Sequence, residues 1–449
     1  MTADAQNAYL MSKPKEHYWI KCGPEFGHNQ GKRAKIVRAL YGLRGSGNAW
    51  RSHLAEILRN DLKFTMCRAD NDVWMRKATK PDGTRYYEYM LVYTDDFLVI
   101  SVDPKSILDA LKTKVMLKPD SIKEPDQYLG ASISKYQFED GEWAWAMGSE
   151  QYIKEAVRNV KNYLARRELF LKKKAPSVLP TGYRPELDLT RECDSEETTY
   201  YQEQIGVLRW AVELGRYDIA AEVSMLASYS AAPRLGHLNA VFHMYAYLNS
   251  HERSKLVFDP SYITHIESEK ADWSDFYPDA EEQLPPDMPE PLGKHVIVTT
   301  FEDSDHAADV VTRRSRTGVL IYLNRAPILA FSKKQNSIET SSFGSEFTAL
   351  KTAVELTEGI IYKLRMMGVP IGGPAIIKGD NMSVISNSSL PQSMLKKKSN
   401  SVAYHYVRER CAMDVCRISY EPSASNVADM LTKIQSGPER TRLAQKVLR

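Results

Sequence analysis

The sequence predicts a mixed fold class, α+β in its first part and α/β in its last, and three observations carry that prediction. Two β-rich runs flank a short acidic turn within residues 86–102. Residues 202–248 are rich in Ala, Leu, Met and Glu with little Pro or Gly, a composition typical of helices. After residue 295, three strands, a long helix, a further strand and a final helical region follow, which is the element order of an α/β layer domain.

Composition narrows the class of protein. The 449 residues are too many for one ordinary domain, and 43% hydrophobic with 26% charged residues predicts a folded core. The formal net charge is only +3, so any nucleic-acid contact must come from local basic patches. The five cysteines form no C-x-x-C pair, and no apolar run approaches the roughly 18 residues of a membrane helix. We therefore expect a soluble intracellular protein without a membrane partner, in the cytoplasm, the nucleus or both.

The first β-rich runs are predicted to pair as a tight hairpin. Only Thr94, Asp95 and Asp96 separate Tyr86–Tyr93 from Phe97–Val102. Adjacent carboxylates repel each other, whereas Mg²⁺ takes hard oxygen ligands. The two acids alone favour a solvated turn, but the flanking strands favour a metal site because they hold the tip on a rigid sheet.

Composition changes most sharply between Glu267 and Glu290. Nine acids there accompany one basic residue, Lys270, and four prolines. Like charges repel and proline blocks helix continuation, so this stretch is predicted to be an exposed linker.

The last part is predicted to be an α/β layer. Its expected strands are His295–Phe301, Thr317–Leu323, Pro327–Phe331 and Ala375–Lys378, and its long helix covers about Ser345–Met367. Four acids stand at or near the element ends: Asp303, Glu346, Asp380 and Asp429. Meeting on one face, they would repel each other unless metal ions were bound, although acids at element ends are also ordinary capping residues.

The first part of the chain resembles reverse transcriptases. Tyr93–Asp96 (YTDD) is similar to their Y-x-D-D box, and Asp4 followed five residues later by Tyr9 is similar to their first carboxylate motif. Further stretches resemble copia-type retrotransposon polymerases and the helical segment that follows them: Ala39–Arg44 with Ala49 and Trp50, Tyr128–Gly130, Tyr201–Trp210, Arg216–Ser224 and His237–Leu248.

That resemblance implies roles for individual residues. Asp4, Asp95 and Asp96 would hold two divalent ions for nucleotide transfer. Tyr9 would exclude a ribose 2′-hydroxyl by its bulk, or else is a core tyrosine of the same element. Gly45 stands where a glutamine is common in the family, which weakens the nucleotide side of the pocket.

The last part resembles the RNase H domain of the same copia-type elements. The similar stretches are Glu302–Asp309, Thr312–Gly318, Ser332–Asn336, Thr340–Phe347, Asp380-Asn381, Tyr404–Glu409 and Asn426–Lys433. By this resemblance Asp303, Glu346, Asp380 and Asp429 are the ligands of two Mg²⁺ (or Mn²⁺) ions that activate water against RNA in an RNA–DNA hybrid. Asp305 is the alternative to Asp303 as the first ligand.

Other residues are implied in substrate contact. His405 would assist product release or proton transfer, or is a structural histidine beside two tyrosines. Lys396, Lys397 and Lys398, with Arg313 and Arg314, would contact the hybrid backbone, and the alternative for these is a solvated loop.

Together these features are identified as a fragment of a copia-type LTR retrotransposon polyprotein. The predicted parts are a truncated reverse-transcriptase palm (1–136), a helical thumb- or connection-like region (137–262), an acidic Pro-rich linker (263–294) and an RNase H-like three-layer domain (295–449). The expected partners are an RNA–DNA hybrid, an RNA template, a DNA primer and, if the polymerase works, a dNTP.

Three functions compete at this stage. The chain is a working polymerase-nuclease, a nuclease whose polymerase half is impaired, or a non-catalytic nucleic-acid-binding relic. Because polymerases of this family carry a fingers region before the first aspartate, and Asp4 is the fourth residue here, the sequence predicts an impaired polymerase half.

Overall fold

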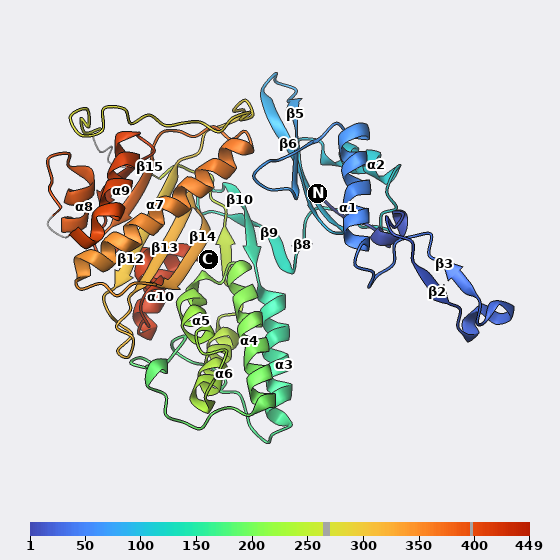
Figure 1. Cartoon of the computed structure of the whole chain (residues 1–449), viewed down its shortest axis with the longest axis horizontal. Helices are drawn as coiled ribbons and strands as arrows, with labels where there is room; N and C mark the ends of the chain where they lie inside the picture. The colour runs from blue at the N-terminus through green and yellow to red at the C-terminus, as the bar shows by residue number, and fades with distance from the viewer. Residues whose placement is uncertain (264–269, 396–397) are drawn as a thin grey trace. The chain divides into compact units, whose positions relative to one another are not determined.

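The computed structural model describes residues 1–263, 270–395 and 398–449, and the chain forms two compact units. Unit 1 contains residues 1–129, 287–294 and 363–370. Unit 2 contains residues 130–286, 295–362 and 371–449. The predicted domain boundaries stay predictions, because these units divide the chain differently: the helical middle and the C-terminal sheet fall into one unit (Figure 1).

A five-stranded antiparallel sheet forms the centre of unit 1. Its strand order is β1 (Thr2–Asp4), β7 (Asp96–Ile100), β6 (Arg85–Tyr93), β5 (Val73–Thr79) and β4 (Thr65–Met66). The predicted hairpin is present as β6 and β7, with Tyr93 opposite Asp96 across a turn of Thr94 and Asp95. Asp4 on β1 is also opposite Asp96, so the sheet brings two of the three predicted acids together.

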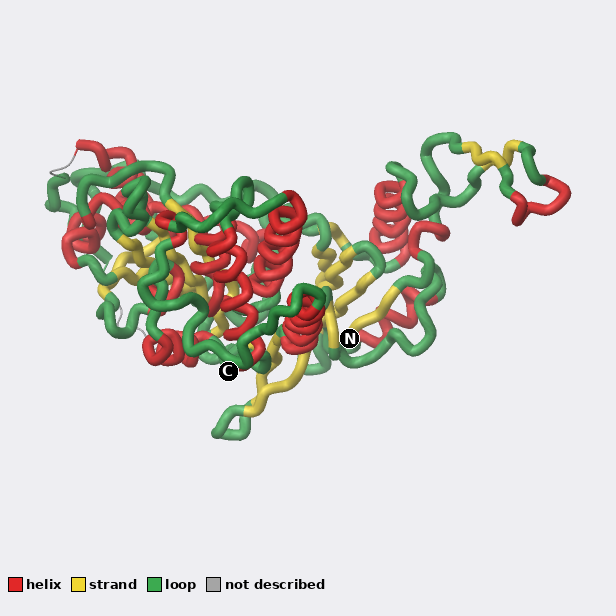
Figure 2. The backbone as a smooth tube through the Cα atoms, turned by 90° about the horizontal axis from the view of Figure 1, so that it is seen from below, coloured by secondary structure: helices red, strands yellow, loops and turns green. Residues whose placement is uncertain are grey.

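Helices α1 (Ser46–Glu56) and α2 (Pro104–Lys112) contribute apolar side chains to the core of unit 1. Trp50, Leu54 and Leu108 from these helices pack with Phe97 of β7. The remaining unit 1 elements are η1 (Ala8–Met11), β2 (Trp19–Lys21), η2 (Pro24–Asn29), β3 (Arg33–Lys35), η3 (Ile57–Asp61) and β8 (Gln127–Tyr128). The ribbon of β2 and β3 extends away from the five-stranded sheet (Figures 1 and 2).

Two late segments complete unit 1, and the linker assignment of residues 263–294 stays a prediction. Glu290 is exposed and accepts hydrogen bonds from Arg85 Nη1 at 2.8 Å and from Lys77 Nζ at 2.9 Å. In unit 2, Trp273 is only 6% exposed and lies 4.8 Å from the Arg408 guanidinium. Residues 264–269 of the predicted linker lie outside the described residues.

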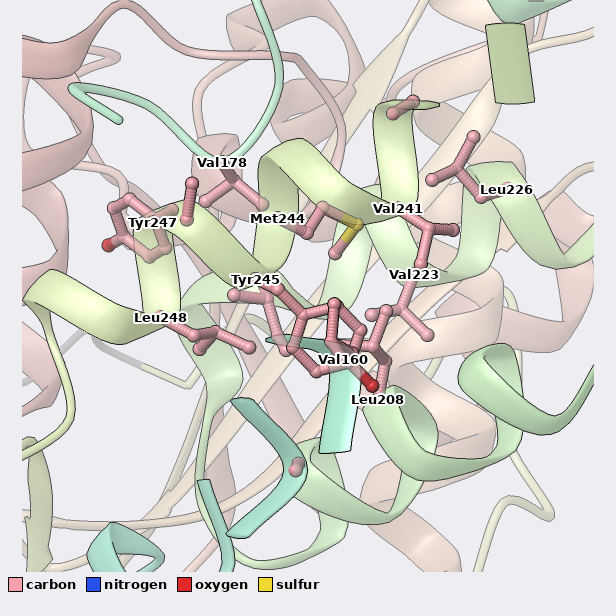
Figure 3. Close-up of a cluster of buried hydrophobic side chains, with 14 of the residues drawn as sticks. Val160, Val178, Leu208, Val223, Leu226, Val241, Met244, Tyr245, Tyr247 and Leu248 are labelled. Carbon is pink, nitrogen blue, oxygen red and sulfur yellow. The ribbon is translucent and has the colours of Figure 1, made fainter. Parts of the chain in front are cut away.

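The helical prediction for residues 202–248 is confirmed in unit 2. Four helices, α3 (Glu150–Ala165), α4 (Ser195–Glu213), α5 (Ala220–Ala227) and α6 (Leu235–Ser250), enclose an apolar cluster that includes Val160, Leu208 and Met244 (Figure 3). The short helices η4 (Pro185–Leu187) and η5 (Tyr217–Ile219) join them, and strands β9 (Ala131–Gln137), β10 (Trp143–Gly148) and β11 (Lys255–Val257) form an antiparallel sheet in the same unit.

A mixed five-stranded sheet confirms the α/β class of the last part. Its order is β14 (Ala326–Lys334), β13 (Arg316–Leu323), β12 (Val298–Asp305), β15 (Ala375–Gly379) and β16 (Cys416–Tyr420). The first three strands are antiparallel, and β15 and β16 run parallel to β12. The long helix α7 (Ser342–Met366) lies on one face, where the Thr300 and Thr357 hydroxyls are 2.7 Å apart.

The other face of this sheet is covered by η7 (Val427–Leu431) and α10 (Gly437–Val447), so the part has three layers. Helices α8 (Met382–Ser389) and α9 (Ser401–Ala412) and the turn η6 (Lys398–Asn400) complete it. Among residues 1–263, 270–395 and 398–449, no helix combines the length and apolar character that crossing a membrane requires.

Strand β12 differs from its prediction. We predicted its end at Phe301, but it continues through both aspartates to Asp305, which pairs with Arg316. Strand β12 is longer because it pairs with β13 along the whole length of β12. This pairing tolerates the two aspartates, although aspartate has a low β-strand propensity. Asp303 therefore lies inside a strand and not after one.

Candidate metal centre

Three of the predicted acids meet in unit 2. Asp303 of β12, Glu346 of α7 and Asp380, directly after β15, each offer a carboxylate oxygen, and these oxygens all lie within 4.8 Å of one another. In the described part of the chain, this is the only group of three or more acid, His or Cys side chains so close together. The fold therefore brings together three acids that are far apart in the sequence, one from a strand, one from a helix and one from a loop.

Burial makes the carboxylates of Asp303 and Glu346 costly to ionise. Asp303 is 1% exposed, and burial raises its pKa to about 8. Burial, followed by repulsion from Asp303 and Asp380, raises the pKa of Glu346 to about 9. Glu346 Oε2 is buried and accepts no hydrogen bond from the described residues. Such a site favours a bound cation, which would relieve the repulsion.

Asp429 joins the centre through a lysine. Lys433 Nζ lies 2.6 Å from Asp429 Oδ1 and 3.4 Å from Asp303 Oδ2, so one ammonium bridges the two acids. The Thr432 hydroxyl also donates to Asp303 Oδ2. Thr432 and Lys433 were not predicted as site residues, although the i, i+4 spacing of Asp429 and Lys433 was a usable signal.

Hydrogen bonds also fix Asp380. Its Oδ2 accepts a 2.6 Å bond from the Ser423 hydroxyl. The next residue, Asn381, caps α8 by accepting from the backbone N–H groups of Ser383 and Val384. The capped helix start therefore holds the acid in place.

A further buried acid, Glu302, was not predicted as a site residue. It is buried beside the centre, and burial followed by repulsion from Glu346 and Asp303 raises its pKa well above the usual value. A Cβ at Gly379 would lie 2.1 Å from Glu302 Oε1, so only a glycine leaves room for this side chain. Its position next to Asp303 in the sequence was the available signal.

Asp305 lies outside the group of three. Its Oδ1 accepts the backbone N–H of Arg316, and burial raises its pKa to about 6. Of the two alternatives for the first ligand, the geometry places Asp303, and not Asp305, with Glu346 and Asp380.

The predicted backbone-contact residues are exposed where the structure describes them. Arg313 and Arg314 stand in the turn between β12 and β13, and Lys398 begins η6. Lys396 and Lys397 lie outside the described residues. His405 Nδ1 is 2.9 Å from the Tyr277 hydroxyl, a bond that fits the structural alternative, while its role in catalysis stays a prediction.

The acids of unit 1 are arranged less tightly. Lys118 Nζ lies 2.5 Å from Asp4 Oδ2, and Asp95 is in the hairpin turn. Burial, followed by repulsion from Asp95 and Asp4, raises the pKa of Asp96. The three carboxylates do not form a group as close as the one in unit 2.

Tyr9 lines a cavity of about 430 Å³ in unit 1 together with Trp50 and Arg51. Its ring centroid lies 4.6 Å from that of Tyr41, and the side chain is half-buried. Both readings of Tyr9, nucleotide contact and core packing, are compatible with this position.

The chain has curated relatives among retroelement proteins. It is 23% identical over 449 residues to the retrovirus-related Pol polyprotein from transposon RE1 of Arabidopsis thaliana, covering 99% of this chain and 27% of the relative. It is 22% identical to the corresponding polyprotein from transposon TNT 1-94 of Nicotiana tabacum, covering 96% of this chain and 29% of the relative. The putative transposon Ty5-1 protein of Saccharomyces cerevisiae is 24% identical over 79% of this chain and all of the relative.

Solved structures give weak likenesses. The N-terminal RNase H domain of rv2228c from Mycobacterium tuberculosis covers 33% of this chain and 97% of its own, with 15% identity and a TM-score of 0.23. The foamy viral protease-reverse transcriptase in complex with RNA/DNA hybrid covers 98% of this chain and 67% of its own, with 10% identity and a TM-score of 0.24. At these TM-scores, neither adds weight to the assignment.

The chain is similar over nearly its whole length to retrovirus-related Pol polyproteins of transposons, at 22–23% identity. No family model matches it. The predicted resemblance is confirmed by the curated relatives: the chain is related, over nearly its whole length, to the Pol polyproteins of copia-type retrotransposons. It spans about a quarter of the length of the two plant relatives described above.

Proposed function

We propose that unit 2 is a metal-dependent ribonuclease H that cuts the RNA strand of an RNA–DNA hybrid. The observation that carries the proposal is the convergence of Asp303, Glu346 and Asp380 within 4.8 Å at the end of a buried strand. The similarity to retrovirus-related Pol polyproteins supports the substrate class, because the sequence resemblance to the RNase H domain of copia-type elements implies an RNA–DNA hybrid.

The residues fit divalent ions. Asp303, Glu346 and Asp380 offer hard oxygen ligands, and Glu346 Oε2 has no hydrogen-bond partner among residues 1–263, 270–395 and 398–449. Asp303 and Asp429 would hold a second ion on the side where Lys433 now bridges them. When bound, two Mg²⁺ (or Mn²⁺) ions supply Lewis-acid polarisation of water and of the phosphodiester.

The chain's own hydrogen bonds prepare this centre. The Ser423 hydroxyl donates to Asp380, and the Thr432 hydroxyl donates to Asp303. Because these bonds exist before any ligand binds, the carboxylates need little reorganisation, which is the main requirement for electrostatic stabilisation of a transition state. Exposed Arg313, Arg314 and Lys398 would contact the backbone of the hybrid.

The test is cleavage of a labelled RNA–DNA hybrid by the full chain with Mg²⁺. Glu346→Gln keeps the shape of the side chain but removes a ligand charge, so we expect a loss of about 100-fold or more in rate. Glu355→Gln, on the exposed face of the same helix where it pairs with Lys351, is the matched control and should cut normally. Equal rates for parent and Glu346→Gln would refute the metal assignment.

A second candidate function belongs to unit 1. Asp4 opposite Asp96, with Asp95 in the adjoining turn, supports RNA-directed DNA synthesis from a template, a DNA primer and dNTPs. The Lys118–Asp4 pair would have to open for an ion to bind Asp4. Primer extension on an RNA template, abolished by Asp95→Asn, would support this function. Hybrid binding without either activity would favour the non-catalytic relic.

A further inference from the structure

A cavity of about 230 Å³ in unit 2 adjoins the proposed metal centre. It lies between the loop that leads into η4, helix α5 and the turn that joins β12 to β13. The lining residues that matter for its chemistry are Tyr183, Arg314, Arg316, Thr432 and Lys433. A volume this small is below the roughly 300 Å³ of a typical drug-sized ligand site, so it suits a single compact group.

Two hydrogen-bond donors at this cavity, Arg316 and Tyr183, have no charged acceptor among the described residues. Arg316 is 5% exposed, and its Nη1 donates to the Ser224 hydroxyl at 2.8 Å and the Ser332 hydroxyl at 3.2 Å. A guanidinium has five N–H donors, so two hydroxyls leave it undersatisfied. The Tyr183 hydroxyl is buried and has no hydrogen-bond partner in the described part of the chain. Burial raises the pKa of this phenol, which keeps its proton available for donation.

The carboxylates around the cavity already have partners. Asp309 pairs with Lys334 at 2.5 Å, and Asp305 accepts the backbone N–H of Arg316. Glu186 accepts the backbone N–H of Val310 at 3.2 Å. The surplus is therefore of donors and positive charge, which a ligand with several acceptor oxygens and a negative charge would complement.

The cavity also adjoins the metal centre. Thr432 and Lys433 line it, and the same two side chains bond Asp303 and Asp429. A group held in the cavity would thus lie next to the carboxylates. We propose that this cavity binds a phosphate group, and that in the working protein it is a backbone phosphate of the nucleic-acid strand held at the metal centre. The second clause rests on the proposed ribonuclease function, whereas phosphate binding itself does not.

The first experiment uses inorganic phosphate and the full chain, in EDTA and at constant ionic strength. We expect saturable binding by calorimetry. Tyr183→Phe removes one donor and Arg314→Gln one exposed charge, and each should weaken binding about tenfold, the effect of losing one charge-assisted hydrogen bond. Arg325→Gln removes an exposed arginine outside the cavity and should bind like the parent. No binding by the parent, or equal affinity in all four proteins, would overturn the proposal.

The second experiment identifies the source of the phosphate. A hybrid in EDTA carries one neutral methylphosphonate linkage, moved position by position along each strand. We expect one position to weaken binding by the parent and to have a smaller effect on Arg314→Gln, because one partner of that phosphate is already lost there. If every position behaves alike while inorganic phosphate still binds, the ligand is a free phosphate and the backbone assignment is wrong. Neither experiment needs metal or cleavage, so a failure of the ribonuclease proposal would be seen separately.

Discussion

Lys433 supplies the positive charge that holds two acids of the centre together. Its ammonium lies between Asp429, at 2.6 Å, and Asp303, at 3.4 Å. Glu346 and Asp380 also lie close to Asp303, and neither forms an ion pair with a described residue. The two halves of the centre therefore differ: one is open to an ion, and the other must first release a lysine.

This difference leads to a prediction about metal binding. Lys433→Met should tighten the binding of the second Mn²⁺ by at least about tenfold, because it removes a competing charge a few ångström from two carboxylates. Calorimetry or electron paramagnetic resonance, with the number of bound ions counted, measures the change. Lys378→Met, which removes a lysine paired with Glu421 at 3.0 Å, is the control and should leave Mn²⁺ binding unchanged. Unchanged affinity in Lys433→Met would mean that the ammonium does not occupy an ion's place.

The sequence could predict the acids but not all their partners. Asp303, Glu346 and Asp380 belong to short stretches that resemble RNase H motifs, and the expected fold brings those stretches together. Tyr183 belongs to a loop that is far in sequence from Arg314, Thr432 and the other late residues that line the same cavity. No local pattern encodes such a meeting, because loop paths depend on tertiary packing.

At the scale of elements, the approach of β13 to η7 positions half of the centre. A Cβ at Gly318 would lie 2.8 Å from both Leu431 Cβ and Thr432 Cγ2, and 2.9 Å from the Ala428 carbonyl oxygen. Real Cβ atoms do not approach other atoms so closely, so the strand and the turn touch only because residue 318 has no side chain.

We predict that Gly318→Ala destabilises unit 2 by about 1–3 kcal/mol, the usual cost of overpacking. The added methyl group pushes on Thr432, which bonds Asp303, so metal affinity should fall as well. Denaturant unfolding and Mn²⁺ titration measure the two effects. Gly359→Ala, in α7 with nothing within 4 Å of the added carbon, should be neutral or stabilising. Equal behaviour of the two variants would show that η7 can shift freely.

Helix α4 begins with a capping box that depends on pH. Asp194 Oδ1 accepts the backbone N–H of Glu197 at 2.9 Å, and Glu197 Oε2 accepts that of Asp194 at 3.0 Å. Arg191 donates to both Glu197 oxygens, at 2.7 and 2.8 Å. This arginine, more than the backbone bond, lowers the pKa of Glu197 to about 2.

A lowered pKa means that the ionised Glu197 stabilises the folded chain. The contribution is complete above the unfolded pKa of about 4.3 and is lost as pH falls from there toward 2. The melting temperature of Glu197→Gln should therefore lie below that of the parent at pH 6, and the gap should close as pH falls toward 3. Glu203→Gln, at an exposed position of the same helix, should show no such gap. A gap that stays constant down to pH 3 would contradict the ionic origin.

The sequence predicted whether a segment is a helix or a strand where its composition or its hydrophobic alternation was clear. It did not predict where those helices and strands begin and end. The hairpin of β6 and β7 and the helices α4 to α6 appear where they were expected. Strand β16 (Cys416–Tyr420) was missed, because its stability comes from parallel pairing with the distant β15 and not from its own sequence.

At the scale of the molecule, a buried charge network joins the middle helices to the C-terminal helix. Arg216 donates to both oxygens of Asp218, at 2.8 and 2.7 Å. Arg440 of α10 donates to Glu222 of α5 and to the Asp218 carbonyl oxygen. These charges are fully buried, so each depends on its partner for compensation. The network is one reason that the two predicted regions form a single compact unit, which no local sequence signal reveals.

We predict that Arg440→Met destabilises unit 2 by about 3–5 kcal/mol, because it leaves Glu222 buried without a counter-charge. Adding Glu222→Gln should recover part of the loss. Urea unfolding, followed by circular dichroism, measures both. Arg442→Met, on the same helix but in the more exposed pair with Glu439, should cost no more than about 1 kcal/mol. A loss no larger for Arg440 than for Arg442 would show that the network does not hold α10 in place.

Unit 1 is closed by two segments that come late in the sequence. The Tyr89 hydroxyl donates to the Met367 carbonyl at 2.7 Å, the Tyr87 hydroxyl to that of Glu290 at 3.0 Å, and Met366 packs against Cys67. During synthesis, the first sheet therefore leaves the ribosome long before the residues that cover its tyrosines. A chaperone that shields this sheet would have to stay bound until about residue 370 has emerged, since proteins made from the N-terminus expose apolar surface until their partners arrive.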